Sequence, residues 1–593
     1  VYKKGIFMIK ILKNLNKKEI EIFIICFILI FIQVWLDLKM PDYMSKITVL
    51  VQTEGSKMSD IIINGLYMLA CAFGSLLSAV FTGFLASKIS SNFSKKLRKK
   101  IFDKVENLSL HEVKTFSTSS LITRTTNDVT QIEMLISIGL QLLIKAPITA
   151  VWAVTKILNK SWQWSTVTAV GLVILLSTVA IITSFVIPRF KKVQKLTDKL
   201  NGVTRENLTG IRVVRAFNAE KYQENKFENT NNELTNIMLF NQKKFAFMQP
   251  IMYLVMYGLT LSIYFIGAYL IKDALMVDKL PIFGDMIVFS SYAMQVIMAF
   301  MMLSMIFMIL PRAQVSANRI NEVLEEDISI KDGLIDKDTT KEKGTIEFKN
   351  VSFKYPDADE YLLKNISFKV NTGETIAFIG STGSGKSTLI NLVPRFYDAT
   401  DGEVLIDGIN VKDYKQEFLY NKLGYVSQKA VMFNGTVKSN VTFGKGKKKI
   451  TNKKIEEAIK VAQAEEFIMK LDNKYDSHIA QGGTNISGGQ KQRISIARAI
   501  AREPEIYIFD DSFSALDYKT DSQLRKELKK YTKDATTLIV AQRIGTIMNA
   551  DKIVVLDKGV IVGIGKHKEL LKNCDVYKEI AYSQLSKEEL ENE

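Results

Sequence analysis

Six long apolar runs occupy the first half of this 593-residue chain, and the second half contains none of comparable length. A helix needs roughly 20 apolar residues to cross a bilayer, and the runs are of that size. We therefore predict six membrane-spanning helices, at about 20–36, 61–86, 134–158, 164–187, 245–271 and 286–310. The first and third runs carry the charged residues Glu21, Lys145 and Lys156, whereas the other four are uncharged.

The polar segments between the runs differ in length. Those after the second and fourth runs, 88–133 and 188–244, are much the longest and contain little proline. They predict helices that leave the membrane and return, and some 25 residues at about 1.5 Å each would reach roughly 40 Å. In addition, residues 6–18 have the basic, amphipathic pattern of a short helix that lies on the membrane surface.

Charge decides the predicted orientation. The formal net charge of +17 would by itself also fit a nucleic-acid-binding protein. However, the segments 1–19, 88–133 and 188–244 carry 27 Lys and Arg residues, against 6 in the segments on the opposite side. Segments rich in positive charge stay in the cytoplasm, next to the anionic inner leaflet. We therefore expect a multi-pass protein of the plasma membrane, with its N-terminus in the cytoplasm and no nucleic-acid partner.

From Gly344 onward the pattern changes to alternating strands, turns and helices. A short apolar run at 375–379 is typical of a buried strand, and 387–390 open a helix. The glycine-rich loop between them would wrap its backbone N–H groups around the phosphates of a nucleotide, with Lys386 on the β- and γ-phosphates and Ser387 on Mg²⁺. The predicted nucleotide-binding residues of this stretch are Gly380, Ser381, Thr382, Gly383, Ser384, Gly385, Lys386, Ser387 and Thr388.

Further residues of a nucleotide site follow this loop or precede it. Asp510 ends the apolar strand 506–510 and is suited to hold Mg²⁺, through water. Tyr355 has two readings: it could stack on adenine, or it could pack in the core as a strand aromatic. The stretch Ser487, Gly488, Gly489 and Gln490 forms a glycine turn that opens a helix, and such a helix start favours anions.

The string from Ile486 to Arg493 resembles the signature of ATP-binding cassette (ABC) proteins, and the resemblance extends over almost the whole chain. Six spans ahead of one cassette resemble an ABC exporter half-transporter. This implies an α-helical six-span exporter domain (type IV) at 1–325, a linker at 326–343 and an α/β P-loop nucleotide-binding domain at 344–593. It also implies ATP and Mg²⁺ as cofactors, with Gln428 among the residues that bind ATP and Mg²⁺.

In this family two nucleotide domains enclose two ATP molecules head to tail, so a signature acts on the ATP of the partner. Ser487, Gly488, Gly489 and Gln490 would then contact the partner's ATP. The family's D-loop corresponds here to Ser514, Ala515, Leu516 and Asp517. The strings at 116–129 and 210–217 resemble its cytoplasmic coupling regions, with coupling helices expected near 112–122 and 205–220.

Two positions depart from the pattern of active members. A glutamate that polarises the attacking water usually follows the magnesium-binding aspartate, and here that position is Asp511, one methylene shorter. The histidine that usually contacts the γ-phosphate is replaced by Gln542. Loss of general acid–base help is worth about 10²–10⁴-fold, so we expect this chain's own site to be slow by at least ~10²-fold. The alternative is that Asp511 still serves as the base.

The intact signature and the altered site together predict an asymmetric pair. This chain would complete a competent site on a second, non-identical ABC half-transporter. Gln481 stands where symmetric members more commonly have glutamate, and its surroundings resemble the degenerate-site subunit of heterodimeric bacterial exporters. Export by alternating access is the function that follows from the resemblance.

Two features of the spans concern the cargo. Five methionines of the sixth span recur at alternating intervals of four and three, which places them on one helical face: Met294, Met298, Met301, Met305 and Met308. A flexible, polarisable face suits small amphipathic or drug-like substrates, although helix packing or lipid contact would explain it equally well. Lys145 is the second feature, because a charge in mid-membrane faces protein or water. An architectural or inter-subunit contact is the reading we favour for it.

Three functional classes remain open from the sequence. The first is an asymmetric multidrug-type exporter, and the second is a homodimeric lipid or peptide flippase that uses Asp511 as its base. The third is a regulatory module that mainly binds ATP, for which the chain offers no additional domain. A second, different six-span chain would distinguish the first class from the second.

Overall fold

The computed structural model describes residues 16–158, 162–444, 446 and 450–585. Contacts divide the chain into two units, one made of residues 1–106 and 119–326 and the other of residues 107–118 and 327–593. The surface helix predicted at 6–18 lies mostly outside the described residues. In the described part, the first unit is helical and the second is α/β.

Six long helices build the first unit, and each contains a stretch apolar enough to cross a membrane. They are α2 (Lys17–Gln52), α3 (Met58–Glu106), α6 (Asn127–Leu158), α7 (Trp162–Thr209), α9 (Glu220–Asp273) and α10 (Met276–Glu325). The six predicted spans are thereby confirmed. As the long polar segments predicted, α3, α7 and α9 run on far beyond their apolar stretches. The short helices α5 (Thr118–Thr125) and α8 (Ile211–Ala216) lie in the same segments.

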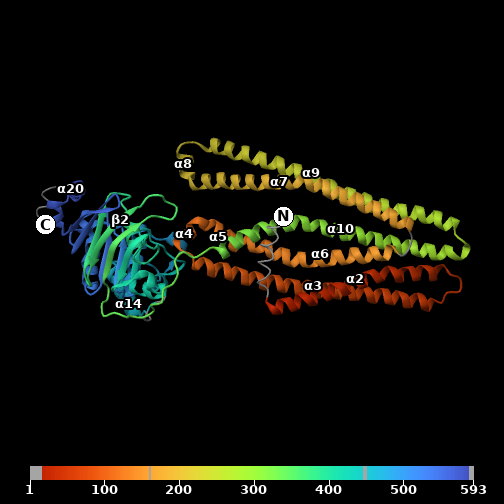
Figure 1. The fold of residues 1–593 in the computed structure, drawn as a ribbon, viewed down its shortest axis with the longest axis horizontal. Helices are drawn as coiled ribbons and strands as arrows, with labels where there is room; N and C mark the ends of the chain where they lie inside the picture. Colours follow the sequence, from red (N-terminus) through yellow and green to blue (C-terminus); the bar gives the residue numbers. More distant parts are fainter. Residues whose placement is uncertain (1–15, 159–161, 445, 447–449, 586–593) are drawn as a thin grey trace. The chain divides into compact units, whose positions relative to one another are not determined.

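These helices associate in pairs. α2 packs along α3, α6 along α10 and α7 along α9, as Figure 1 shows. The sequence of α2 explains its contact, because Cys26, Ile30 and Val34 are four residues apart and therefore share one face, and all are buried. Phe27 and Phe31 lie elsewhere on α2 and are nearly half exposed, as expected of a helix surrounded by lipid.

The second unit contains two main sheets. The larger has the order β12–β11–β3–β10–β9–β6 and is parallel except for β12 at its edge. Its strands are β3 (Thr375–Gly380), β6 (Leu423–Val426), β9 (Ile506–Asp510), β10 (Thr536–Val540), β11 (Lys552–Asp557) and β12 (Val560–Gly565). The antiparallel sheet β2–β1–β4–β5 consists of β1 (Ile346–Phe353), β2 (Leu363–Val370), β4 (Asp401–Ile406) and β5 (Ile409–Asn410). A small ribbon pairs β7 (Gly435–Thr436) with β8 (His478–Ile479).

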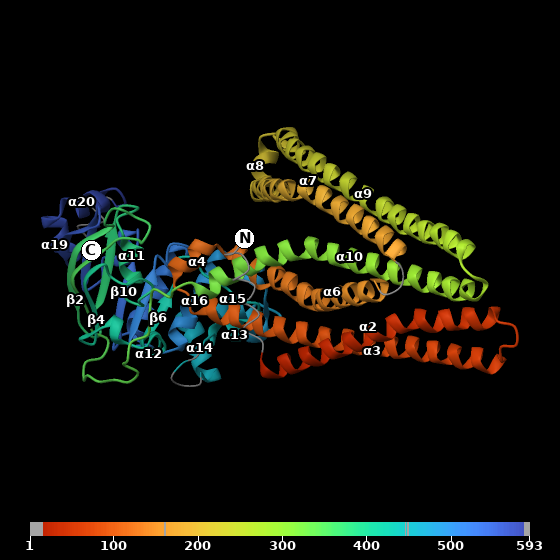
Figure 2. The same cartoon turned by 45° about the vertical axis from the view of Figure 1, so that its right-hand side comes forward.

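Alternation along the central strands separates two core layers. Ile376 and Phe378 of β3 pack with the antiparallel sheet, whereas Ala377 and Ile379 pack with the helices of the other face. Figure 2 labels β2 and β4 of the antiparallel sheet and β6 and β10 of the larger sheet. The helices of this unit are α4 (Leu110–Phe116), α11 (Lys386–Asn391), α12 (Gln416–Lys422), α13 (Val437–Val441), α14 (Asn452–Val461), α15 (Glu465–Met469), α16 (Gly488–Ala501), α17 (Tyr518–Tyr531), α18 (Ile544–Ile547), α19 (His567–Asn573) and α20 (Asp575–Tyr582). Because both faces of the sheet are covered, its carboxyl edge is where polar groups can gather.

The polar segment after α10 folds onto the second unit. Gly333 N donates to Tyr414 O at 3.0 Å, Ile335 N donates to Asp413 O at 2.9 Å, and Lys415 N donates to Ile335 O at 2.8 Å. A side chain on Gly333 would collide with the backbone of Asp413, since a Cβ there would lie 2.1 Å from its carbonyl. This part of the segment is therefore fixed by backbone hydrogen bonds.

Candidate functional site

The glycine-rich loop joins the end of β3 to the start of α11. Lys386, the first residue of α11, turns back over the loop and donates to Gly380 O at 2.9 Å and Ser381 O at 2.8 Å. Glycine is required at Gly380 and Gly385: both have positive φ, and a Cβ would lie 2.0 Å from Leu556 O in the first case and 2.6 Å from a Leu363 methyl in the second. The loop therefore packs closely against Leu556 and Leu363, and the ammonium of Lys386 is hydrogen bonded to the loop backbone.

Ser387 and Asp510 meet beside this loop. Ser387 Oγ donates to Asp510 Oδ1 at 2.8 Å, from α11 to the end of β9. Burial raises the pKa of Asp510, and the neighbouring Asp511 adds to this rise, whereas the hydrogen bond from Ser387 and the charge of Lys386 oppose it. Burial likewise lowers the pKa of Lys386. A buried carboxylate beside a hydroxyl is a set of hard oxygen donors, which fits the Mg²⁺ that accompanies ATP.

Asp511 is held by two glutamines. Its Oδ2 accepts Gln428 Nε2 at 3.1 Å and Gln542 Nε2 at 2.9 Å. The topology explains the meeting, because Gln428, Asp511 and Gln542 each follow one of the adjacent strands β6, β9 and β10. Asp511 is buried and adopts a left-handed backbone conformation, with φ of 46°.

The same neighbours also affect the pKa of Asp511. Burial raises the pKa of its carboxyl, and the amides of Gln428 and Gln542 and the charges of Lys386 and Arg543 oppose the rise. The two glutamine amides donate only to one oxygen, and neither can take up a proton at neutral pH. The arrangement therefore orients a short carboxylate without supplying a second base.

Tyr355 lies beside α11 in the second unit. Its hydroxyl and Thr388 Oγ1 are 2.9 Å apart, and its ring makes edge contacts with Phe353 and Tyr397. The ammonium of Lys114, from α4, lies 5.8 Å from the ring centroid. The sequence analysis did not single out Lys114 or the hydroxyl contact, because nothing in the spacing of these residues brings them together. Half-buried packing leaves both readings of Tyr355 open.

The signature residues open α16. Ser487 Oγ accepts Gln490 N at 3.3 Å, and Gln490 Oε1 accepts Ser487 N at 2.9 Å, which is a capping box. Ser487 and Gly488 are exposed, and a Cβ on Gly488 would meet no atom within 4 Å. The start of α16 is therefore an ordered and open surface of backbone N–H groups.

Two of the D-loop residues form hydrogen bonds with residues three positions away along the chain. Ser514 Oγ donates to Asp511 O at 2.9 Å, and Asp517 caps α17 by accepting Thr520 N at 2.9 Å. Leu516 is buried, and Ala515 is exposed. A residue that the sequence analysis did not select, Ser512, is fully buried and donates to Val426 O at 3.0 Å, which ties β9 to β6 next to Gln428.

The residues predicted for a substrate cavity lie on two helices, Lys145 on α6 and the five methionines on α10. Lys145 pairs with Asp37 of α2, with Nζ and Oδ2 3.2 Å apart. Met298 and Met305 of α10 are each 52% exposed, and Met294 and Met301 are partly buried. The fifth methionine, Met308, also lies on α10. In the sequence, Asp37 is a charged residue directly after the first predicted span. Only the fold shows that it is the partner of Lys145.

Comparison with known proteins identifies the family. Residues 23–300 match the family described as ABC transporter transmembrane region, and residues 363–514 match the one described as ABC transporter. An uncharacterized ABC transporter ATP-binding protein of Mycobacterium tuberculosis is 38% identical over 522 residues, which is 88% of each chain. The chain belongs to the ABC transporter family.

Other similar proteins include a lipid flippase and an exporter of known structure. YfiB of Bacillus subtilis, an uncharacterized ABC transporter ATP-binding protein, is 36% identical over 88% of this chain and 90% of its own. The ATP-dependent lipid A-core flippase of Pseudomonas aeruginosa is 33% identical over 84% of this chain and 80% of its own. A bacterial Atm1-family ABC exporter with ATP bound shares the fold, with a TM-score of 0.80, 23% identity and coverage of 95% and 98%.

These findings confirm the predicted fold class, a six-span exporter domain followed by a nucleotide-binding domain. The ABC transporter is an ATPase of the transport type and a multi-pass membrane protein. Its family implies ATP binding, with Mg²⁺ as the usual companion ion. Ser387 and Asp510 are the residues whose geometry fits that ion.

Proposed function

We propose that this ABC exporter chain is one half of a heterodimer whose two ATP sites differ. Its own site binds ATP and hydrolyses it slowly, and its signature completes a faster site on a non-identical partner chain. The observation that carries this proposal is the carboxylate of Asp511, held by the amides of Gln428 and Gln542 at 3.1 and 2.9 Å.

The geometry of Asp511 supports slow hydrolysis. A general base must come within about 2.6–3.2 Å of the proton it removes, and a side chain shorter by one methylene starts farther from the water. Oδ2 already accepts two amide hydrogens, so its lone pairs are partly used. Gln542, in turn, can donate a hydrogen bond to a phosphate oxygen but cannot carry the positive charge of an imidazolium. We expect a rate at least ~10²-fold below that of a site with glutamate and histidine.

The rest of the site supports ATP binding. It is supported by Lys386 on the glycine-rich loop, which could turn to a phosphate, and by the contact of Ser387 with Asp510, which suits Mg²⁺. The exposed start of α16 offers backbone N–H groups to a phosphate of a second chain. Bound ATP would therefore join the two nucleotide domains, and hydrolysis at the partner's site would separate them again. That cycle drives alternating access of the spans.

For cargo and location, we propose amphipathic or drug-like molecules exported from the cytoplasm across a bacterial plasma membrane. The excess of Lys and Arg in 1–19, 88–133 and 188–244 supports a cytoplasmic nucleotide domain. The exposed Met298 and Met305 support an adaptable apolar surface on α10.

A second candidate is a homodimeric lipid flippase in which Asp511 acts as the base. The relatives called lipid A-core flippases favour it, since they are 31–33% identical over more than four fifths of this chain. In this case two copies of the chain would hydrolyse ATP at two equal sites.

The deciding experiment is the ATPase rate of the full chain in lipid bilayers, alone and co-purified with a second, different six-span chain. Under our proposal the chain alone turns over negligibly and the pair turns over rapidly. Lys386→Ala in this chain would then reduce ATP binding at its own site and leave much of the pair's turnover. Rapid turnover of the chain alone would overturn the heterodimer in favour of the flippase, and ATP binding without transport by the pair would favour a regulatory module.

A further inference from the structure

Two Lys–Asp pairs join α2 to α6 within the membrane unit. Lys145 Nζ lies 3.2 Å from Asp37 Oδ2, and Lys156 Nζ lies 3.1 Å from Asp42 Oδ2. Both aspartates have a further donor on a third helix, which fixes their positions. Asp37 Oδ1 accepts the hydroxyl of Ser75 from α3 at 2.5 Å, and Asp42 Oδ1 accepts that of Tyr292 from α10 at 2.6 Å.

The four charged side chains are only partly covered. Their exposed fractions are 25% and 24% for Lys145 and Asp37, and 35% and 28% for Lys156 and Asp42. Placing a charge in the hydrocarbon of a bilayer is costly, and charged groups in spans accordingly face protein, water or a polar ligand. The open side of these pairs therefore requires a partner of one of these kinds.

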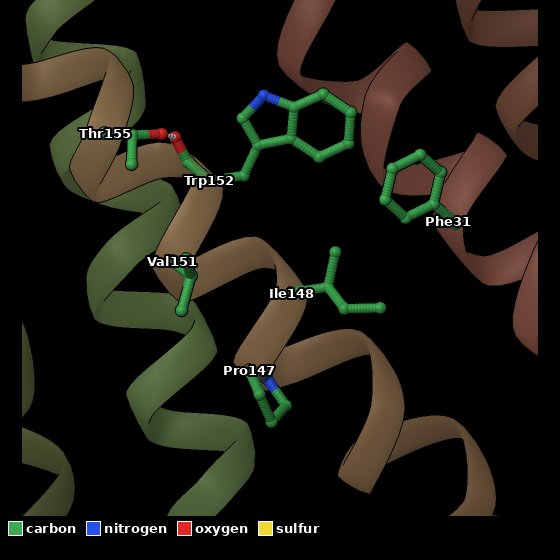
Figure 3. A pocket seen from close by; sticks show the side chains of 6 residues that line it. All are labelled: Phe31, Pro147, Ile148, Val151, Trp152 and Thr155. Atoms are coloured by element: carbon green, nitrogen blue, oxygen red, sulfur yellow. Dashed lines mark hydrogen bonds between the residues drawn. The ribbon is translucent and has the colours of Figure 1, made fainter.

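An apolar groove lies along the same two helices, with a volume of about 450 Å³. Figure 3 shows its lining: Phe31 from α2 and Pro147, Ile148, Val151, Trp152 and Thr155 from α6. Lys145 precedes this stretch of α6 and Lys156 follows it, so the groove is bracketed along α6 by the two ion pairs. The rings of Phe31 and Trp152 are 5.0 Å apart. Its volume is within the range of about 300–1,000 Å³ that small-ligand sites have.

We propose that this groove binds a single-chain zwitterionic amphiphile, with the hydrocarbon chain in the groove and the headgroup on the Lys145–Asp37 ion pair. This inference deepens the proposed export function by naming a substrate class, and it rests on that function. Charge balance selects the zwitterion. A ligand with both signs can place its anionic group on Lys145 and its ammonium on Asp37, so that every charge keeps a partner.

A ligand of one sign lacks this property. It would take one member of the pair and leave the other partly buried and uncompensated, which is the costly way to break an ion pair. A neutral apolar ligand would fill the groove and leave the pairs unused.

Trp152 provides a direct readout, because it is one of only four tryptophans and lines the groove. The full chain would be reconstituted in nanodiscs without nucleotide and titrated with three amphiphiles whose hydrocarbon chains have the same length and carry the same two bromine atoms. Their headgroups would be zwitterionic lysophosphatidylethanolamine, anionic lysophosphatidylglycerol and a cationic alkylamine. Quenching that Trp152→Phe removes reports occupancy of the groove.

We expect the zwitterionic probe to bind at least ten-fold more tightly than the other two. Lys145→Met leaves Asp37 without its lysine and should shift the preference toward the amine, and Asp37→Asn should shift it toward the anionic probe. The exchanged variant Asp37→Lys/Lys145→Asp keeps one charge of each sign and should retain the zwitterionic preference. Lys46→Met, on α2 beside Tyr43 and outside the lining, should change nothing.

Equal affinity for the three probes, or an order that the single variants leave unchanged, would overturn the proposal. Absence of any quenching at Trp152 would also overturn it, because the groove would then be filled by another helix of the assembly. The assay uses no ATP, so its outcome is separate from that of the proposed function. Selective binding without ATP-dependent transport would defeat the export function, and transport without selective binding would defeat this substrate class.

Discussion

Lys422 Nζ and Asp407 Oδ2 are 2.9 Å apart inside the second unit, and two more carboxylates complete the contact. Asp338 Oδ1 lies 2.7 Å and Glu505 Oε2 lies 2.8 Å from the same ammonium. Lys422 is 1% exposed, and its burial would lower its pKa, but the three carboxylates outweigh burial and raise it. Asp338 belongs to the segment after α10, so this lysine fastens that segment to the sheets.

Replacement of Lys422 by methionine should loosen the nucleotide unit strongly. Removing one member of a buried ionic group leaves uncompensated charge and costs about 3–5 kcal/mol. We expect a lower free energy of unfolding for the second unit, together with faster hydrogen exchange at residues 330–336. Lys415→Met is the matched control, because its pair with Asp336 is about half exposed and should matter little. Equal effects of the two variants would show that the buried contacts of Lys422 stabilise the second unit no more than the exposed pair of Lys415 does.

Acid should weaken the start of α4. Glu112 is buried and accepts Ser109 N at 2.6 Å. Burial alone would raise the pKa of Glu112, but hydrogen bonds from Ser109 and Ser329 and the charge of His111 outweigh it, so the pKa is lowered. A lowered folded-state pKa means that Glu112 stabilises the helix above the ordinary value of about 4.3 and that this stabilisation is lost as the pH falls through the folded value.

Hydrogen exchange of residues 110–116 would measure this effect. As the pH falls from about 5 to about 3, through the ordinary and then the lowered folded-state pKa of Glu112, the exchange rate, corrected for intrinsic chemistry, should rise in the native chain. Glu112→Gln keeps an acceptor that does not titrate, so its corrected rate should be nearly independent of pH. A pH dependence of the same size in this variant would assign the effect to another group.

Restoring the long carboxylate and the imidazole should activate this chain's own ATP site. The double variant Asp511→Glu/Gln542→His supplies the base and the γ-phosphate contact together, and we expect its ATPase rate to rise by ~10²-fold or more. Asp511→Asn is the matched control, because it preserves size and removes the charge. In the native chain it should change turnover little; abolished turnover in Asp511→Asn would make Asp511 a working base.

The outline of this site could be predicted from the sequence, and its inner contacts could not. Gly380, Lys386 and Ser387 form a contiguous motif, so a strand, a loop and a helix start specify their arrangement locally. The clamp on Asp511 depends on β6, β9 and β10 being neighbours, which is a property of strand order and not of spacing. Sequence shows that Asp511 is short, but only the fold shows what its carboxylate contacts.

The membrane unit repeats this division between local and distant information. Apolar length predicted all six spans, because each helix satisfies its own backbone within lipid. It did not predict that Lys145 pairs with Asp37, more than 100 positions away along the chain. The resemblance to ABC exporters implied a linker at 326–343, and part of this segment is hydrogen bonded to Asp413 and Tyr414 of the nucleotide unit. A polar segment can be free or bound to a domain, and its composition does not distinguish the two.

The last prediction separates the two roles of α16, as a helix that must be capped and as a surface for a second chain. Ser487→Ala removes the cap, which costs about 0.5–2 kcal/mol, and removes a hydroxyl from the exposed signature. Thr451→Ala removes a comparable cap from α14, whose Thr451 Oγ1 accepts Lys454 N at 3.4 Å, away from the signature. In the co-purified pair both variants should lower thermal stability by similar amounts, but only Ser487→Ala should lower ATPase turnover, by ten-fold or more.

Labelling of this chain's own phosphate loop by an azido-ATP should persist in both, because Ser487 acts on the ATP of the partner. Equal losses of turnover would mean that stability alone is responsible, and loss of labelling in Ser487→Ala alone would place the signature at this chain's own nucleotide.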